Sequence, residues 1–218
     1  MSRDFLTLPD LTERELAHLL KLAADCKRRR RAASRVLQGR TIALVFQKPS
    51  VRTRVSFEVA IHELGGLPMY LGPDDIQLST REPIKDVART LSRYVDGVVV
   101  RMFRHAEVEE FAAYASVPEI NGLSDLHHPC QALADLFTIQ ERFGTIAGRT
   151  IAYIGDGNNV LHSLAQGAVA LGAHLRVATP ATYKPQASIW AQVQRQAKRR
   201  HVSVTWSQEP ETAVRGVD

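Results

Sequence analysis

The stretch GRTIALVFQKPSVRTRVSFEVAIHELGG, residues 39–66, contains the two patterns that decide the fold. Residues 41–46 form a short apolar, β-branched run between a glycine and a proline, which predicts a buried strand. A helix is predicted from Val51 to about Leu64, and two glycines follow it as C-cap residues. A buried strand that leads directly into a helix is the repeating unit of a parallel sheet covered by helices.

The same alternation continues to the end of the chain, so the predicted fold class is α/β. We expect two doubly wound parallel-sheet domains at 1–143 and 149–218, joined by a hinge at Gly144–Gly148. The second domain offers only two or three strands, where a stable doubly wound domain would need four or more. We therefore expect it to be incomplete, or the chain to be a fragment. Further strands are predicted at 67–71, 97–102, 150–155 and 174–180, and further helices at 11–29, 84–94, 105–115, 128–144 and 160–172.

Composition indicates an ordinary globular protein of a reducing compartment. The 218 residues are 44% hydrophobic and 23% charged, which is enough apolar material for a real core. Cys26 and Cys130 are the only cysteines and have no paired spacing, so free thiols and a cytoplasmic location are expected. The leucines of the N-terminal segment are interrupted by acidic residues, which argues against a signal peptide or a membrane span.

A basic run, KRRRR at residues 27–31, and a formal net charge of +5 raise nucleic acid as a partner. The favoured interpretation is that these cations face water and complement the negative end of a helix dipole. Aromatic residues make up only 6% of the chain and are not interleaved with basic ones, which argues further against single-strand binding. A basic chain also suits an enzyme that acts on anionic substrates.

The segment SVRTR, residues 50–54, has the residue types of a phosphate site. Ser50 stands at the expected N-cap, where free backbone N–H groups and the helix dipole favour an anion. Arg52 and Thr53 add a guanidinium group and a hydroxyl group to the same position. The alternative is a capped helix whose two arginines only face solvent.

Two further segments place polar residues at element ends. Arg101 ends a predicted buried strand, where α/β folds hold their ligands, although it could also be an exposed strand-end arginine. His128 and Gln131 begin a helix and could bind a carbonyl oxygen and an amide, or His128 could only cap the helix. A zinc site at His127, His128 and Cys130 is excluded because such adjacent positions cannot surround one ion.

The turn GDGNN, residues 155–159, resembles a dinucleotide-binding turn only in part. It lacks the third glycine, and no acidic residue follows the next strand to bind a ribose, which argues against NAD. Asn158 and Asn159 could present amides to a polar ligand, or could only serve the turn.

Four segments in this order resemble the transcarbamoylase family, most closely its ornithine-specific members. They are SVRTR, Gln77 followed by REPIKDVARTLSRYVDGVVVR, HPCQ and IGDGNNVLHS. The resemblance implies transfer of the carbamoyl group from carbamoyl phosphate to the δ-amine of L-ornithine, which gives citrulline and phosphate in arginine biosynthesis or catabolism. It also implies that no metal, nucleotide or covalent nucleophile takes part, and that the partners are these two substrates, with no nucleic acid or membrane.

The resemblance also implies a role for each matching residue. Arg52, Arg101 and His128 are expected to be catalytic, and a homotrimer with shared sites is expected. In the family, the positions of Ser50, Val51, Arg52 and Thr53 bind the phosphate and that of Arg101 spans phosphate and carbonyl. The family residues at the positions of His128 and Gln131 hold the carbamoyl group. The residue at the position of Gln77 reaches a neighbouring subunit's site, and the residue at the position of Asn159 binds the α-carboxylate and amino end of ornithine.

Two departures from the family pattern qualify these expectations. Val51 replaces a frequent threonine, but this position can still donate its backbone N–H. The later D-x-x-x-S-M-G and H-C-L-P segments of the family have no counterpart in these 218 residues. Activity on aspartate, putrescine or acylated ornithine, and a non-catalytic carbamoyl phosphate-binding role, therefore stay open. The aspartate type is disfavoured because LSTRE lacks the expected lysine.

Overall fold

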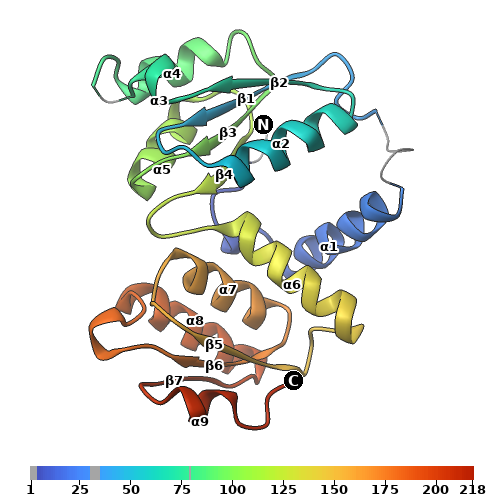
Figure 1. The fold of residues 1–218 in the computed structure, drawn as a ribbon, viewed down its shortest axis with the longest axis vertical. Coiled ribbons are helices and arrows are strands. Elements are labelled where there is room, and N and C mark those ends of the chain that lie inside the picture. The colour runs from blue at the N-terminus through green and yellow to red at the C-terminus, as the bar shows by residue number, and fades with distance from the viewer. Residues whose placement is uncertain (1–3, 30–34, 79) are drawn as a thin grey trace. The chain divides into compact units, whose positions relative to one another are not determined.

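A computed structural model describes residues 4–29, 35–78 and 80–218. These residues form two compact units (Figure 1). Unit 1 holds the described residues up to Leu6 and those from Leu22 to Asp125, and unit 2 holds Thr7–Lys21 and Leu126–Asp218. Part of the basic run, Arg30 and Arg31, lies outside the described residues. Within the described ranges, no helix is both long and apolar enough to cross a membrane.

Unit 1 is built on a four-stranded parallel sheet with the strand order β2-β1-β3-β4. The predicted strand at 41–46 is confirmed, and the helix after it begins at Val51 as predicted. The strands are β1 (Thr41–Phe46), β2 (Leu67–Leu71), β3 (Gly97–Arg101) and β4 (Glu119–Leu123), and the helices are α2 (Val51–Glu63), α3 (Pro73–Ile76), α4 (Ile84–Leu91) and α5 (His105–Tyr114).

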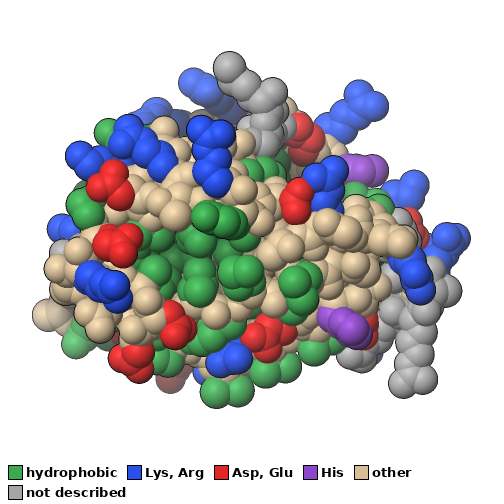
Figure 2. Space-filling view, turned by 90° about the horizontal axis from the view of Figure 1, so that it is seen from above, with side chains coloured by type: hydrophobic (Ala, Val, Ile, Leu, Met, Phe, Trp, Pro, Cys, Tyr) green, Lys and Arg blue, Asp and Glu red, His purple; other side chains and the backbone are tan. Residues whose placement is uncertain are grey.

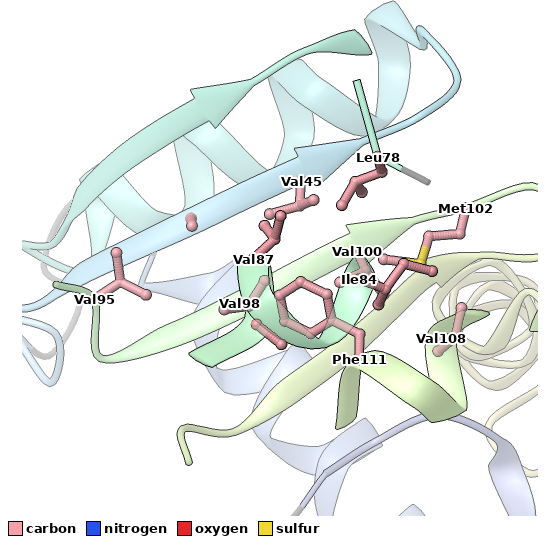
Figure 3. Close-up of a cluster of buried hydrophobic side chains, with 12 residues drawn as sticks. Val45, Leu78, Ile84, Val87, Val95, Val98, Val100, Met102, Val108 and Phe111 are labelled. Atoms are coloured by element: carbon pink, nitrogen blue, oxygen red, sulfur yellow. The ribbon is translucent and has the colours of Figure 1, made fainter. Parts of the chain in front are cut away.

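The chain turns to opposite faces of this sheet after β1 and after β3. Residues of α2 pack on one face around Phe46, while α4 and α5 pack on the other around Phe111 (Figure 3). The strands β1 and β3 are neighbours, and their last residues, Phe46 and Arg101, are paired in register. Their carboxyl ends therefore form a topological switch point, which is where α/β sheets leave a crevice for a ligand.

Unit 2 contains a three-stranded parallel sheet with the order β5-β6-β7, within the number of strands predicted. The α/β prediction is therefore confirmed in both units. The limits 1–143 and 149–218 stay a prediction, because the division into compact units runs through α1 and assigns α6 to unit 2. The strands are β5 (Thr150–Ile154), β6 (His174–Ala178) and β7 (Val204–Ser207), and the helices are α6 (Pro129–Phe143), α7 (Asn159–Ala170), α8 (Ala187–Arg200) and α9 (Pro210–Val214), with α1 (Glu13–Arg28) shared between the units.

The start of α1 is fixed by the predicted capping box. The backbone N–H of Thr12 donates to Glu15 Oε2 over 2.8 Å, and the backbone N–H of Glu15 donates to Thr12 Oγ1 over 3.3 Å. Each side chain thus satisfies a backbone donor that the helix itself cannot pair. This local prediction is confirmed.

Strand β4 was not predicted, because its sequence EINGL is poor in strand-forming residues. Its first residue, Glu119, is fully buried, and neither of its carboxyl oxygens has a hydrogen-bond partner among the described residues. Its backbone N–H donates to Asp4 Oδ1 over 2.9 Å, so a second carboxyl group lies close by. Burial is the larger cause and the charge of Asp4 the smaller one, and together they raise the pKa of Glu119 to about 9. The folded protein therefore holds Glu119 protonated at neutral pH.

Replacing Glu119 with glutamine is expected to remove a pH-dependent loss of stability. The pKa of Glu119 is raised on folding, from 4.5 to about 9. Its contribution to the stability of the folded state is therefore fully present below pH 4.5 and is lost as pH rises toward about 9. The parent's free energy of unfolding should fall, relative to Glu119→Gln, by about 1.4 kcal/mol per pH unit in this window. Denaturant unfolding at pH 6 and pH 8 measures the difference. Parallel pH profiles for the two proteins would contradict a protonated Glu119.

Candidate functional site

The first turn of α2 presents backbone and hydroxyl groups at the switch point of unit 1. Ser50 is the N-cap, and its Oγ accepts a hydrogen bond from the backbone N–H of Thr53 over 3.4 Å. The same Oγ donates to Thr53 Oγ1 over 3.1 Å. Val51 and Arg52 are the first two helical residues, so the helix cannot pair their backbone N–H groups internally. The cap and the hydroxyl pair therefore shape the positive end of a thirteen-residue helix.

The side chain of Arg101 reaches this turn from the end of β3. It is only 8% exposed, donates through Nε to the carbonyl of Lys48 over 3.2 Å, and donates through Nη1 to Thr53 Oγ1 over 3.4 Å. The pKa of Arg101 is lowered mainly by burial and to a smaller extent by repulsion from Arg52. Neither guanidinium group forms an ion pair with any carboxylate of the described chain. Two adjacent, uncompensated cations beside a helix N-terminus favour an anion with several oxygens.

Arg54 has a structural role instead. Its Nε donates to Glu58 Oε1 over 2.9 Å, and its guanidinium group lies 3.8 Å from the ring centre of Tyr70. An ion pair and a cation–π contact already engage this charge. Of the two arginines in the segment, only Arg52 remains available to a ligand.

Gln77 organises the loop after α3. It is exposed and adopts a left-handed conformation, with φ of 44°, which is uncommon for a residue other than glycine. Its carbonyl accepts hydrogen bonds from Thr80 and Arg81. The described hydrogen bonds of Gln77 are thus local, and none joins it to the cluster at the start of α2.

In unit 2, the predicted residues His128 and Gln131 lie at the start of α6. His128 is the N-cap, and its backbone N–H donates to Ser163 Oγ of α7 over 2.9 Å. Gln131 is exposed, and its Nε2 donates to Asp135 Oδ1 over 2.9 Å. Because a carboxylate only accepts, this bond fixes the amide orientation and leaves Gln131 Oε1 as a directed acceptor. Burial raises the pKa of Asp135, although this hydrogen bond opposes the shift.

The two asparagines of GDGNN have different positions. Asn158 is the N-cap of α7, and its Oδ1 accepts from the backbone N–H groups of Val160 and Leu161 over 3.0 and 3.3 Å. Asn158 therefore serves the turn. Asn159 begins the helix four residues before Ser163, and residues at this spacing share a helix face. Asn159 therefore lies on the side of α7 that faces the His128 backbone.

Sequence reasoning missed three residues that hold the predicted ones in place. Asp135 orients Gln131, and Ser163 anchors His128. His162 contacts the loop that precedes α6. The sequence offered a signal for the last two, because they are polar positions in the mostly apolar run VLHSLAQGAVAL, residues 160–171. The structure shows this helix buried from Leu161 to Ala170. Buried polar groups require partners, which such residues find in neighbouring segments.

Family models match nearly the whole chain. Residues 3–141 match the carbamoyl-P binding domain of aspartate/ornithine carbamoyltransferase, and residues 147–218 match the Asp/Orn binding domain. The chain therefore belongs to the aspartate/ornithine carbamoyltransferase family.

Within that family, its relatives are ornithine carbamoyltransferases. Those of Carboxydothermus hydrogenoformans and Thermococcus kodakarensis are 47% and 50% identical over 99% of this chain, which spans 70% and 69% of their lengths. The solved ornithine carbamoyltransferase of Pyrococcus furiosus matches all of this chain with a TM-score of 0.97 at 47% identity. This chain covers 70% of that protein.

Replacing Arg52 with alanine is expected to weaken binding of inorganic phosphate by about tenfold to a hundredfold, because one charge-assisted contact is lost. Arg52 is exposed and has no described ion-pair partner, so unfolding should change by less than about 0.5 kcal/mol. Titration calorimetry measures the affinity.

The matched control is Arg54→Ala, which removes the same charge two residues further along α2. Its phosphate affinity should stay within about twofold of the parent, because Arg54 is paired with Glu58. Equal losses in both variants would indicate a general charge effect, and unchanged affinity in Arg52→Ala would place the anion elsewhere.

Proposed function

We propose that this chain carries the ornithine carbamoyltransferase site, in which carbamoyl phosphate donates its carbamoyl group to the δ-amine of L-ornithine. The observation that carries the proposal is the pair of guanidinium groups, Arg52 and Arg101, beside the capped start of α2. The match to a carbamoyl-P binding domain and the names of the relatives support the same reaction. We take the functional domains to be residues 1–143 and 149–218.

The phosphate is proposed to bind at the first turn of α2. Arg52 supplies a fork of N–H donors, Ser50 and Thr53 supply hydroxyl groups, and Val51 supplies its backbone N–H, which needs no threonine side chain. Arg101 is proposed to reach both the phosphate and the carbonyl oxygen. When the carbamoyl C–O bond breaks, negative charge grows on the departing phosphate, and these cations stabilise it.

His128 and Gln131 are proposed to hold the carbamoyl group. His128 would donate to the carbonyl oxygen, whose charge increases when the amine attacks. Gln131 would accept from the carbamoyl NH₂ through Oε1, the atom left available by its bond to Asp135. The uncharged amine forms a C–N bond with the carbamoyl carbon, the C–O bond to phosphate breaks, and the departing phosphate takes up the proton that the amine loses. Catalysis therefore consists of orientation and charge stabilisation. No metal, nucleotide or covalent nucleophile enters this scheme.

The acceptor amine is proposed to be ornithine, with Asn159 binding its α-carboxylate and amino end. Asn158 already caps α7, whereas Asn159 lies on the helix face toward His128. One Pyrococcus furiosus relative is named anabolic, which supports a biosynthetic role in arginine metabolism. In the described structure Cys26 and Cys130 form no disulfide, in keeping with the cytoplasmic location that we propose.

A homotrimer with shared sites is also proposed, with Gln77 reaching the site of a neighbouring subunit. Five apolar side chains of α2 and β2 are exposed in unit 1, a concentration typical of an interaction surface. Figure 2 looks down on the top of Figure 1, where β2 is the uppermost strand, and shows hydrophobic side chains in a patch ringed by charged ones. The five are Val51, Val55, Val59, Leu67 and Met69.

An isotopic assay tests the proposed reaction. The 218-residue chain, given labelled carbamoyl phosphate and ornithine, should form labelled citrulline, and aspartate, putrescine or acetylornithine should give little product. Sedimentation of the same sample should give about three times the chain mass of 24.2 kDa. Binding of carbamoyl phosphate with no product would assign the chain a non-catalytic role, and preferential use of another amine would reject ornithine.

A further inference from the structure

His162 joins two segments of unit 2 that lie far apart in the sequence. It belongs to α7 and is 4% exposed. Its Nδ1 lies 3.0 Å from the carbonyl oxygen of Leu126, and its Nε2 lies 3.0 Å from the backbone nitrogen of Gln186. The first segment leads into α6 and carries His128, while the second leads into α8.

The two partners determine the protonation of the ring. A carbonyl oxygen only accepts, so Nδ1 must carry a hydrogen to bond Leu126. The backbone N–H of Gln186 only donates, so Nε2 must present its lone pair. Both contacts are satisfied by one neutral tautomer. A proton on Nε2 would point at another N–H and break the contact with Gln186.

Ser163, the next residue of α7, holds the same loop at a second point. Its Oγ accepts from the backbone N–H of His128 over 2.9 Å, and Ser163 is fully buried. The carbonyl of His128 in turn accepts from Ala132, as the first bond of α6. The backbone is therefore fixed on both sides of His127, at Leu126 and at His128.

We propose that His162, held as its Nδ1–H tautomer between Leu126 and Gln186, is a positioning residue that acts together with Ser163 to aim His128 at the carbamoyl group. This inference rests on the proposed function, because it assigns His162 a role in recognising the carbamoyl part of the ligand. His162 acts through the loop and need not touch the substrate. Ser50, Arg52, Thr53 and Arg101 hold the phosphate independently of it.

Because the two ligands depend on different residues, their affinities distinguish a positioning role of His162 from simple structural support. Inorganic phosphate needs only the residues of unit 1, whereas carbamoyl phosphate also needs His128. A displaced loop should therefore weaken carbamoyl phosphate and leave phosphate unchanged. General destabilisation of the chain would lower both affinities together or neither.

Two substitutions divide the functions of the imidazole. The amide of His162→Asn occupies the place of Nδ1 and can still donate to Leu126, but it leaves Gln186 without an acceptor. The amide of His162→Gln occupies the place of Nε2 and can accept from Gln186, but it leaves the Leu126 carbonyl without a donor. Calorimetric titration of each full chain with carbamoyl phosphate and, separately, with inorganic phosphate gives the ratio of the two affinities.

The ratio should fall by about tenfold in His162→Gln and in Ser163→Ala, the range expected when a buried polar partner is removed. It should stay within about threefold of the parent in His162→Asn. The matched control is His174→Gln, because His174 Nδ1 also accepts a backbone N–H, that of Ser203, over 2.9 Å at a different place in unit 2. Its ratio should equal that of the parent.

The outcomes separate the two claims. A parent that binds carbamoyl phosphate no better than phosphate contradicts the proposed function, and the positioning role with it. If the parent binds carbamoyl phosphate more tightly than phosphate, and the folded His162→Gln and Ser163→Ala variants show the same affinity ratio, the positioning role alone is overturned. It is also overturned by a ¹⁵N spectrum of the parent at neutral pH in which His162 carries its hydrogen on Nε2. Circular dichroism establishes that each variant is folded.

Discussion

The structure of the site depends on two like charges held close together. Arg52 and Arg101 repel each other, and burial of Arg101 adds to the cost of its charge. A fold accepts such an arrangement when a ligand of opposite charge completes it. The switch point between β1 and β3 creates this position, because it brings the end of one strand beside the helix start that follows the other.

The features that could be predicted from the sequence are those set by neighbours along the chain. The strand at Thr41–Phe46, the helix start at Ser50 and the capping box of Thr12 and Glu15 all depend on residues within a few positions. Strand β4 could not be predicted, because its strand conformation depends on pairing with β3 and not on local preference. Tertiary packing determined that element.

The same distinction applies to the site. Ser50, Arg52 and Thr53 form a local motif, but the contact of Arg101 with Thr53 joins residues 48 positions apart. Two supporting residues of unit 2 act over similar separations, since Ser163 is 35 positions from His128 and His162 is 36 positions from Leu126. The sequence also left two roles open for the asparagines of GDGNN, and only the hydrogen bonds of Asn158 assign it to the cap. Hydrogen bonds between residues far apart in the sequence, such as those of Arg101 with Thr53 and of His128 with Ser163, leave no periodic signal.

The most direct measurement is a crystal structure of this chain with carbamoyl phosphate. We expect phosphate oxygens within hydrogen-bond distance of Arg52, of Arg101 and of the first-turn N–H groups of α2, with the carbamoyl oxygen near His128. Phosphate bound away from the start of α2, or a carbamoyl group that contacts neither His128 nor Gln131, would contradict this expectation.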